Sequence, residues 1–178
     1  ANAAKYHLDP TRFALFGISA GAHLALMAGL AGDHFGESQP RTEYKPSCIL
    51  DFCGPTDLHC REEVAAQEDV EKCLQALLGD DGITDQALCY LASPATYACT
   101  VPYLPPVLAV QGQEDELVHK TQPETLQKIY QARGGAFSII KVEHGNHGFS
   151  STPPTPPASP THKEIFTASI QFLLSHLQ

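Results

Sequence analysis

The chain has 178 residues and a formal net charge of −9, because 20 acidic residues outnumber 11 basic ones. This length suffices for one domain with a substantial hydrophobic core. The acidic balance and the lack of any lysine- or arginine-rich cluster argue against nucleic acid and anionic membrane surfaces as partners. No apolar run is long enough to span a membrane, and residues 1–7 lack the apolar core of a signal peptide.

The first half of the chain predicts two strands and two helices. A strand at 12–16 leads into a helix at 20–31. A second strand follows at 47–53, and then a helix at 61–78 with apolar residues at helical spacing, which Gly79 ends.

The second half repeats the pattern after a mixed stretch with a short helical piece at 86–90 and a turn at Ser93-Pro94. Strands are expected at 106–112 and 136–142, the latter with the partial alternation of an edge strand. Each is followed by a predicted helix.

Capping boxes mark the starts of these two helices, with Thr121 paired to Glu124 and Thr161 paired to Glu164. A Pro-rich surface loop, 152–160, leads into the last helix. We expect that helix to pack through an apolar stripe made of Phe166, Ile170, Leu173, Leu174 and Leu177.

Alternating strands and helices predict an α/β fold, with a mostly parallel sheet covered by helices on both faces. We expect residues 1–178 to form a single domain in which 58–103 are a cap-like insertion.

The cysteines show no pair or cluster with the spacing of a zinc site, so we expect neither a metal nor a cofactor. Cys48 and Cys53 lie in or beside an apolar run and are expected to be small buried hydrophobes. The pattern leaves the cellular compartment open and favours reduced thiols, as in the cytoplasm. The six are Cys48, Cys53, Cys60, Cys73, Cys89 and Cys99.

The most informative motif is G-x-S-x-G, formed by Gly17, Ser19 and Gly21 between the first predicted strand and helix. This is the layout of a nucleophile elbow, in which a sharp turn exposes the serine hydroxyl. Gly17 and Gly21 are expected to keep side chains out of the crowded turn. The N–H of Ala20, at the helix N-terminus, is expected to bind a developing oxyanion.

A serine nucleophile needs a base and a carboxylate, and ligands of parallel sheets gather at the carboxyl ends of the strands. Glu114 and Asp115 follow the third predicted strand, and His144 and His147 follow the fourth. The order serine, acid, histidine is that of α/β-hydrolase triads.

Several alternatives remain at this point. His147, flanked by Gly148 and Phe149, is favoured over His144, which would then be structural or lie on the substrate side. Glu114 competes with Asp115 for the acid. Asp57, after the second strand, is more typical of a turn residue. His23 either lines the site from the elbow helix or packs within the fold.

Together these residues resemble the carboxylesterase branch of the α/β-hydrolase superfamily, with its hormone-sensitive-lipase-like and feruloyl- or acetylxylan-esterase-like members. The resemblance implies that Ser19 is the nucleophile, Asp115 the acid and His147 the base. It runs essentially end to end and rests on Tyr6 to Arg12, Phe16 to Gly21, Phe52 to Leu58, Ser93-Pro94, Gln111 to Val118 and His147 to Phe149.

The chain departs from the family pattern in three places. Ala22 stands where a second glycine is frequent after the elbow, and Gln111 where the acid loop often has histidine. The third departure is that no H-G-G oxyanion loop occurs, so the sequence looks like the C-terminal two-thirds of such a hydrolase. We therefore expect the first strand to be an exposed sheet edge. A second copy of the chain, a separate N-terminal fragment or a rearranged Ala1–Tyr6 segment could cover it, and we expect a homodimer or larger assembly.

The resemblance implies a serine esterase for short-chain acyl esters, with acetyl or aryl esters of carbohydrates as candidate substrates. Two alternatives are a catalytically impaired or non-catalytic hydrolase-fold module and a serine peptidase of the prolyl-oligopeptidase type.

Overall fold

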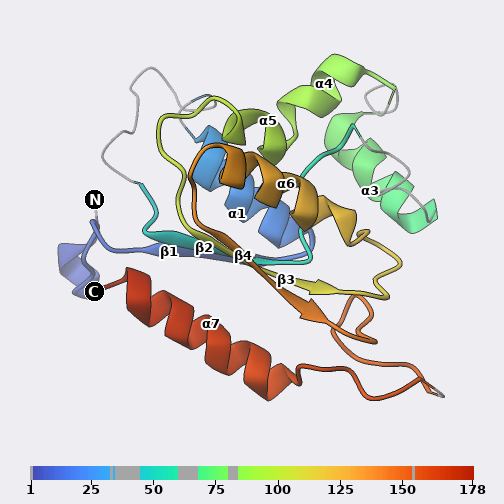
Figure 1. Cartoon of the computed structure of the whole chain (residues 1–178). Coiled ribbons are helices and arrows are strands. Elements are labelled where there is room, and N and C mark those ends of the chain that lie inside the picture. The colour runs from blue at the N-terminus through green and yellow to red at the C-terminus, as the bar shows by residue number, and fades with distance from the viewer. Residues whose placement is uncertain (1, 33, 35–44, 60–67, 80–83, 154) are drawn as a thin grey trace.

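Four parallel strands form one sheet in the order β1-β2-β3-β4 (Figure 1). The computed structural model describes residues 2–32, 34, 45–59, 68–79, 84–153 and 155–178. The predicted α/β class is confirmed. The strands are β1 (Ala14–Ile18), β2 (Cys48–Phe52), β3 (Val107–Gly112) and β4 (Phe137–Val142).

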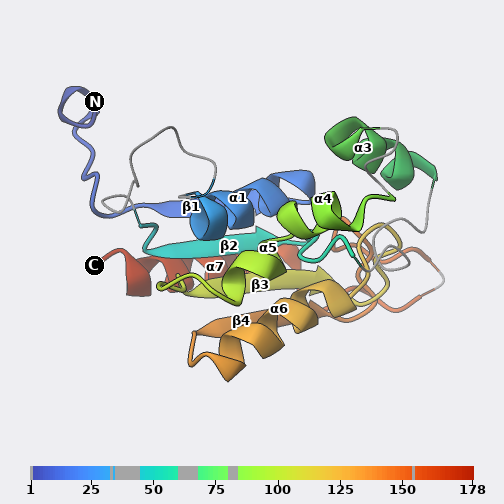
Figure 2. The same ribbon diagram turned by 90° about the horizontal axis from the view of Figure 1, so that it is seen from above.

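Helices cover both faces of this sheet. On one face lie α1 (Ala20–Ala31), α5 (Pro94–Ala98) and α6 (Thr121–Ala132), and on the other lies α7 (His162–His176) (Figures 1 and 2). A short 3-10 helix, Ala4–Tyr6, precedes β1. The helices α3 (Glu68–Leu78) and α4 (Gln86–Leu91) lie on the same side as α1.

The two central strands are buried along their whole length, as expected for parallel strands covered on both faces. Ile49 and Val107 pack with Leu26 and Tyr130 under the α1–α6 layer. Val110 packs with Ile165, Phe149 and other side chains on the α7 side. The carboxyl ends of the strands are therefore held firmly, and these ends carry the candidate site.

The first strand lies at the sheet edge and begins two residues later than predicted. Asp9 accepts hydrogen bonds from the Thr11 N–H and from Arg12 Nε, at 2.9 and 2.7 Å. These bonds form a turn that takes Arg12 out of the strand. Phe16 and Ile18 on this strand are 55% and 52% exposed, which agrees with an open edge.

The predicted capping box at Thr121 is wrong. Lys120 is the N-cap of α6 and makes no side-chain cap bond, because Glu124 accepts a 2.6 Å hydrogen bond from Lys141 on β4 instead. The box between Thr161 and Glu164 is present at the start of α7.

One further prediction needs correction, and another is tested only in part. The predicted turn at Ser93-Pro94 is the start of α5, where Pro94 takes a first-turn position that suits proline. The predicted helix at 61–78 is described only from Glu68 on, and 61–67 lie outside the described residues.

The apolar stripe predicted for α7 is wrong in part. The face that packs on the sheet is the row of Ile165, Ser169, Phe172 and Leu173, while Phe166, Ile170 and Leu174 are more than half exposed. Phe166, Ile170 and Leu174 each come one residue after a residue of the packed row. In a helix of 3.6 residues per turn, one residue further along turns the side chain by about 100° around the helix axis, away from the sheet. This exposed row adds apolar surface to the molecule.

Candidate active site

The elbow turns sharply between β1 and α1. Ser19 has φ 55° and ψ −122°, in the left-handed half of backbone space that non-glycine residues seldom adopt. The turn is held by the Ser19 N–H, which donates to the Phe52 carbonyl at 2.7 Å. The serine side chain is thereby lifted from the sheet at the start of the helix.

Only one of the two elbow glycines lies where a side chain would collide with the surrounding backbone. A Cβ on Gly17 would overlap the backbone of Gly21 and Ala22. A Cβ on Gly21 would meet nothing within 4 Å, so the prediction that both glycines avoid crowding is wrong for Gly21. Gly17 is the glycine on which the turn depends.

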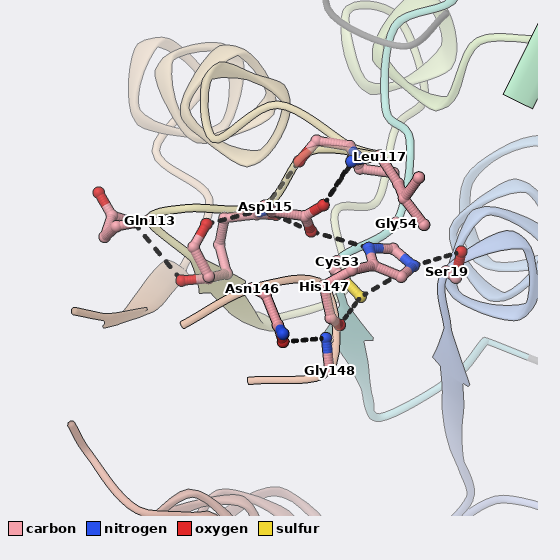
Figure 3. A network of polar contacts seen from close by, with 12 residues as sticks. Ser19, Cys53, Gly54, Gln113, Asp115, Leu117, Asn146, His147 and Gly148 are labelled. Carbon is pink, nitrogen blue, oxygen red and sulfur yellow. Dashed lines mark hydrogen bonds and ion pairs between the residues drawn. The ribbon is translucent and has the colours of Figure 1, made fainter. Parts of the chain in front are cut away.

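Three side chains from three strand ends meet in a line (Figure 3). His147 Nε2 lies 3.0 Å from Ser19 Oγ, and His147 Nδ1 lies 2.8 Å from Asp115 Oδ2. Asp115 follows β3 and His147 follows β4. With Nδ1 protonated and donating to the carboxylate, Nε2 is free to accept the serine proton.

The Asp115 carboxylate is fully buried and held from several sides. Its Oδ1 accepts the N–H groups of Leu117 and Val118, each at 2.9 Å, and its Oδ2 accepts Gln111 Nε2 at 3.1 Å. These donors orient the carboxylate toward His147. Sequence reasoning treated Gln111 only as a departure from the family, although a glutamine inside a buried strand signals a polar contact.

The loop that carries His147 is packed closely against the end of β3. A Cβ on Gly112 would overlap the carbonyls of Gly145 and Asn146. Asn146 Oδ1 accepts the N–H groups of Gly148 and Ser150, at 2.9 and 3.1 Å. The backbone on both sides of His147 is therefore constrained.

The competing candidates pair with each other outside this line. His144 Nδ1 lies 3.0 Å from Glu114 Oε1, and both side chains are well exposed. Glu114 and His144 thus form a separate surface pair, while Asp115 and His147 form the pair next to Ser19.

The other two candidates have structural partners. His23 is buried, and its Nδ1 donates to the Pro55 carbonyl at 3.0 Å, which ties α1 to the turn after β2. Burial lowers the pKa of His23 and favours the neutral ring. Asp57 accepts the His59 N–H at 2.9 Å, as predicted for a turn residue.

Cys53 is the residue near the site that sequence reasoning missed. It is buried as predicted, but its Sγ lies 3.9 Å from His147 Nε2 and 3.6 Å from the His147 carbonyl oxygen. Its φ of 49° bends the chain at the end of β2. Burial, with the charge of Asp115, raises the pKa of the Cys53 thiol to about 12. No local pattern signals this contact, since Cys53 and His147 are 94 residues apart.

Asp51 is a second buried acid beneath the site. Its Oδ1 accepts the Gly54 N–H at 2.9 Å, and burial raises the pKa of its carboxyl to about 7. This bond shapes the turn that carries Cys53.

Within the part of the chain that the structure describes, no helix has the length and apolar character needed to cross a membrane.

A parallel sheet with a serine elbow after one strand, and an acid and a histidine after two later strands, defines the α/β-hydrolase class. A protein-family model described as BD-FAE matches residues 1–130. The chain belongs to this family, which confirms the resemblance to the carboxylesterase branch of the α/β-hydrolases.

Solved structures with the same fold include esterases and peptidases. A truncated carbohydrate esterase from gut microbiota is 23% identical (TM-score 0.74) and is matched over 98% of this chain and 63% of its own. An esterase from Thermogutta terrifontis is 21% identical (TM-score 0.69), and the match covers 98% of this chain and 59% of the esterase. An acylaminoacyl peptidase is 17% identical (TM-score 0.74), and the match covers 99% of this chain and 25% of the peptidase.

These identities establish a shared fold, and the chain spans less than two-thirds of each of the three structures. No curated protein sequence matches the chain.

Proposed function

We propose that this chain is a serine esterase in which Ser19 is the nucleophile, His147 the general base and Asp115 the orienting acid. The observation that carries the proposal is the continuous line from Ser19 Oγ to His147 Nε2 at 3.0 Å and from His147 Nδ1 to Asp115 Oδ2 at 2.8 Å. Both distances are within hydrogen-bond reach, which proton transfer requires.

The reaction follows from this geometry. Ser19 Oγ attacks the ester carbonyl carbon while His147 Nε2 takes its proton, and Asp115 stabilises the imidazolium. Collapse of the tetrahedral intermediate releases the alcohol, which receives the proton from Nε2. A water molecule, deprotonated by the same nitrogen, then frees the acid from the acyl-enzyme.

The negative charge that develops on the carbonyl oxygen needs donors. We assign the Ala20 N–H as one of them, because it directly follows Ser19 at the first residue of α1. Gly17 supports this arrangement by allowing the close approach of β1 to the helix start.

The substrate class we propose is short-chain acyl esters, including acetyl or aryl esters of carbohydrates. The family assignment favours ester substrates, and one similar structure is a carbohydrate esterase. Hydrolysis of p-nitrophenyl acetate tests the activity. The parent chain should turn it over and Ser19→Ala should not, whereas equal rates in the two proteins would overturn the proposal.

A peptidase is the second candidate, because an acylaminoacyl peptidase shares the fold. An amide substrate compared with an ester of the same acyl group separates the two. The esterase proposal predicts that the ratio of ester to amide cleavage by the protein exceeds the ratio of the two uncatalysed rates.

A catalytically impaired module is the third candidate. Labelling with a fluorophosphonate probe distinguishes it from a slow esterase, since an activated Ser19 reacts even where turnover is weak. A folded chain that stays unlabelled would favour the impaired module.

We further propose that the chain forms a homodimer or larger assembly through the edge of β1, where Phe16 and Ile18 are exposed. Light scattering coupled to size-exclusion chromatography tests this, and a monomeric mass would contradict it. We also propose a single domain with a cap-like insertion at 58–103. Leu58, Leu74 and Cys89 in its first part form a small cluster of their own, whereas α5 near its end packs in the main core.

A further inference from the structure

Three potential metal ligands meet at the candidate active site. Cys53 Sγ, His147 Nε2 or Nδ1 and an Asp115 oxygen each lie within 4.8 Å of one another. The three residues come from the ends of β2, β4 and β3, so only the fold brings them together. The spacing of the cysteines and histidines along the chain contains no zinc pattern.

We propose that Cys53 Sγ and His147 Nε2 form a binding site for a soft divalent cation such as Zn²⁺, and that its occupation blocks Ser19. The blocking effect rests on the proposed esterase function, whereas the binding itself does not.

The separation of the two donor atoms suits a tetrahedral ion. Zinc bonds of about 2.3 Å to sulfur and about 2.0 Å to nitrogen place these atoms about 3.5 Å apart at a tetrahedral angle. Cys53 Sγ and His147 Nε2 are 3.9 Å apart, so a small closing movement suffices. Ser19 Oγ, 3.0 Å from the same nitrogen, provides an oxygen at the ion's open side.

The third residue acts through the histidine. Asp115 Oδ2 is engaged by His147 Nδ1 at 2.8 Å, so it holds the tautomer whose Nε2 lone pair is available. A carboxylate–histidine–metal arrangement of this kind is common around zinc and increases the basicity of the ligand. The buried charge of Asp115 also attracts a cation. The proposed triad and the proposed metal site thus use the same Nε2 lone pair of His147. A bound ion would therefore prevent His147 from accepting the Ser19 proton.

The chemistry of the donors sets the choice of ion. A thiolate and an imidazole favour zinc and its soft relatives, whereas magnesium and calcium prefer oxygen. Coordination releases the thiol proton of Cys53 to solvent, so the Zn–S bond replaces the S–H bond. The His147 side chain is 23% exposed, so solvent reaches the ring even though Cys53 is buried.

Cadmium provides a direct readout, because a cadmium–thiolate bond absorbs in the ultraviolet whether or not the chain is active. The experiment uses the full chain with Cys60, Cys73 and Cys99 replaced by serine, which leaves Cys53 and the buried Cys48 and Cys89 as the remaining thiols. Cd²⁺ is then titrated into this background and into its Cys53→Ala and Cys53→Ser variants.

Cys48→Ala is the matched control, because Cys48 is equally buried and lies at the opposite end of β2. Circular dichroism checks that each variant is folded. Zn²⁺ competition against Cd²⁺ gives the zinc affinity, and Mg²⁺ in excess tests selectivity.

We expect thiolate absorption in the background protein and in Cys48→Ala, and its loss in both Cys53 variants. Asp115→Asn should weaken the metal affinity by roughly 10–100-fold, the usual effect of losing the partner of a zinc-bound histidine. Equal absorption with and without Cys53, or none in the folded background protein, would overturn the site.

Ester turnover tests the blocking effect separately. Zn²⁺ should inhibit the background protein, a chelator should restore it, and Cys53→Ala should resist the same zinc concentration. Bound zinc without inhibition would refute the block. A chain that binds cadmium and hydrolyses no ester would retain the metal site and lose the proposed function.

Discussion

Gln111 donates a hydrogen bond from Nε2 to Asp115 Oδ2 at 3.1 Å, from within a fully buried strand. The same nitrogen donates to the Val118 carbonyl at 3.0 Å, so Gln111 holds both Asp115 and the backbone of the loop that follows it. In the proposed triad, Gln111 is therefore a positioning residue, whose effect on the reaction would pass through Asp115 and His147.

Replacing this glutamine should impair catalysis more than stability. In Gln111→Met the side chain keeps its volume but loses its donors, and we expect kcat to fall while the free energy of unfolding drops by about 1–3 kcal/mol. Ester turnover and urea unfolding measure the two effects. Gln113→Met is the control, because this half-buried side chain donates to the Gln111 carbonyl at 3.4 Å and not to Asp115. An equal loss of kcat in both variants would contradict the assigned role.

Asp115 and Glu114 are neighbours in sequence with different partners. Asp115→Asn should lower kcat by roughly 10⁴-fold, the loss known from the equivalent change in a chymotrypsin-type protease, because an amide no longer holds the productive histidine tautomer. Glu114→Gln breaks only the surface pair with His144 and should leave kcat within about twofold. Steady-state kinetics decide, and a comparable loss in both would refute the assignment of the acid.

The two elbow glycines should respond differently to alanine. Gly17→Ala forces a methyl group into the backbone of the following turn, so we expect a destabilisation of about 3 kcal/mol or more, or a failure to fold. Gly21→Ala adds a methyl group in open space within a helix and should change stability by less than about 1 kcal/mol. Urea unfolding of both variants measures this contrast, and similar values would contradict it.

The buried carboxyl of Asp51 should make stability depend on pH. Its pKa is raised from 3.8 to about 7 in the folded protein, so between these values the folded state holds a proton that the unfolded chain has released. This group's contribution to the free energy of unfolding therefore decreases as pH rises from about 4 to about 7.

Asp51→Asn removes this titration and should flatten the pH dependence over that window. Thermal unfolding at a series of pH values, in parent and variant, provides the measurement. Parallel curves for the two proteins would show that Asp51 ionises normally.

The order of strands and helices could be predicted because it depends on local patterns. The run from Cys48 to Phe52 is apolar apart from Asp51 because both of its faces are covered, and Thr161 caps its helix through Glu164 only three residues away. The elbow is similarly local, since Gly17, Ser19 and Ala20 determine one turn.

The remaining features depend on partners far along the chain. The sequence at Thr121 fits a capping box as well as the sequence at Thr161 does. However, Glu124 accepts a hydrogen bond from Lys141 on β4 and does not reach back to the helix start. The contact of Cys53 with His147 likewise requires the parallel register of the sheet. The surface pair of Glu114 and His144 could not be separated from the site by sequence, since Glu114 is next to Asp115 and His144 is three residues before His147.

The most direct test of the account is the residue that reacts with a fluorophosphonate probe. Mass spectrometry of the labelled chain should find the phosphonyl group on Ser19, with labelling lost in Ser19→Ala, strongly slowed in His147→Ala and unchanged in His144→Ala. Labelling of another residue, or equal rates in the two histidine variants, would contradict the claim that His147 and Asp115 activate Ser19.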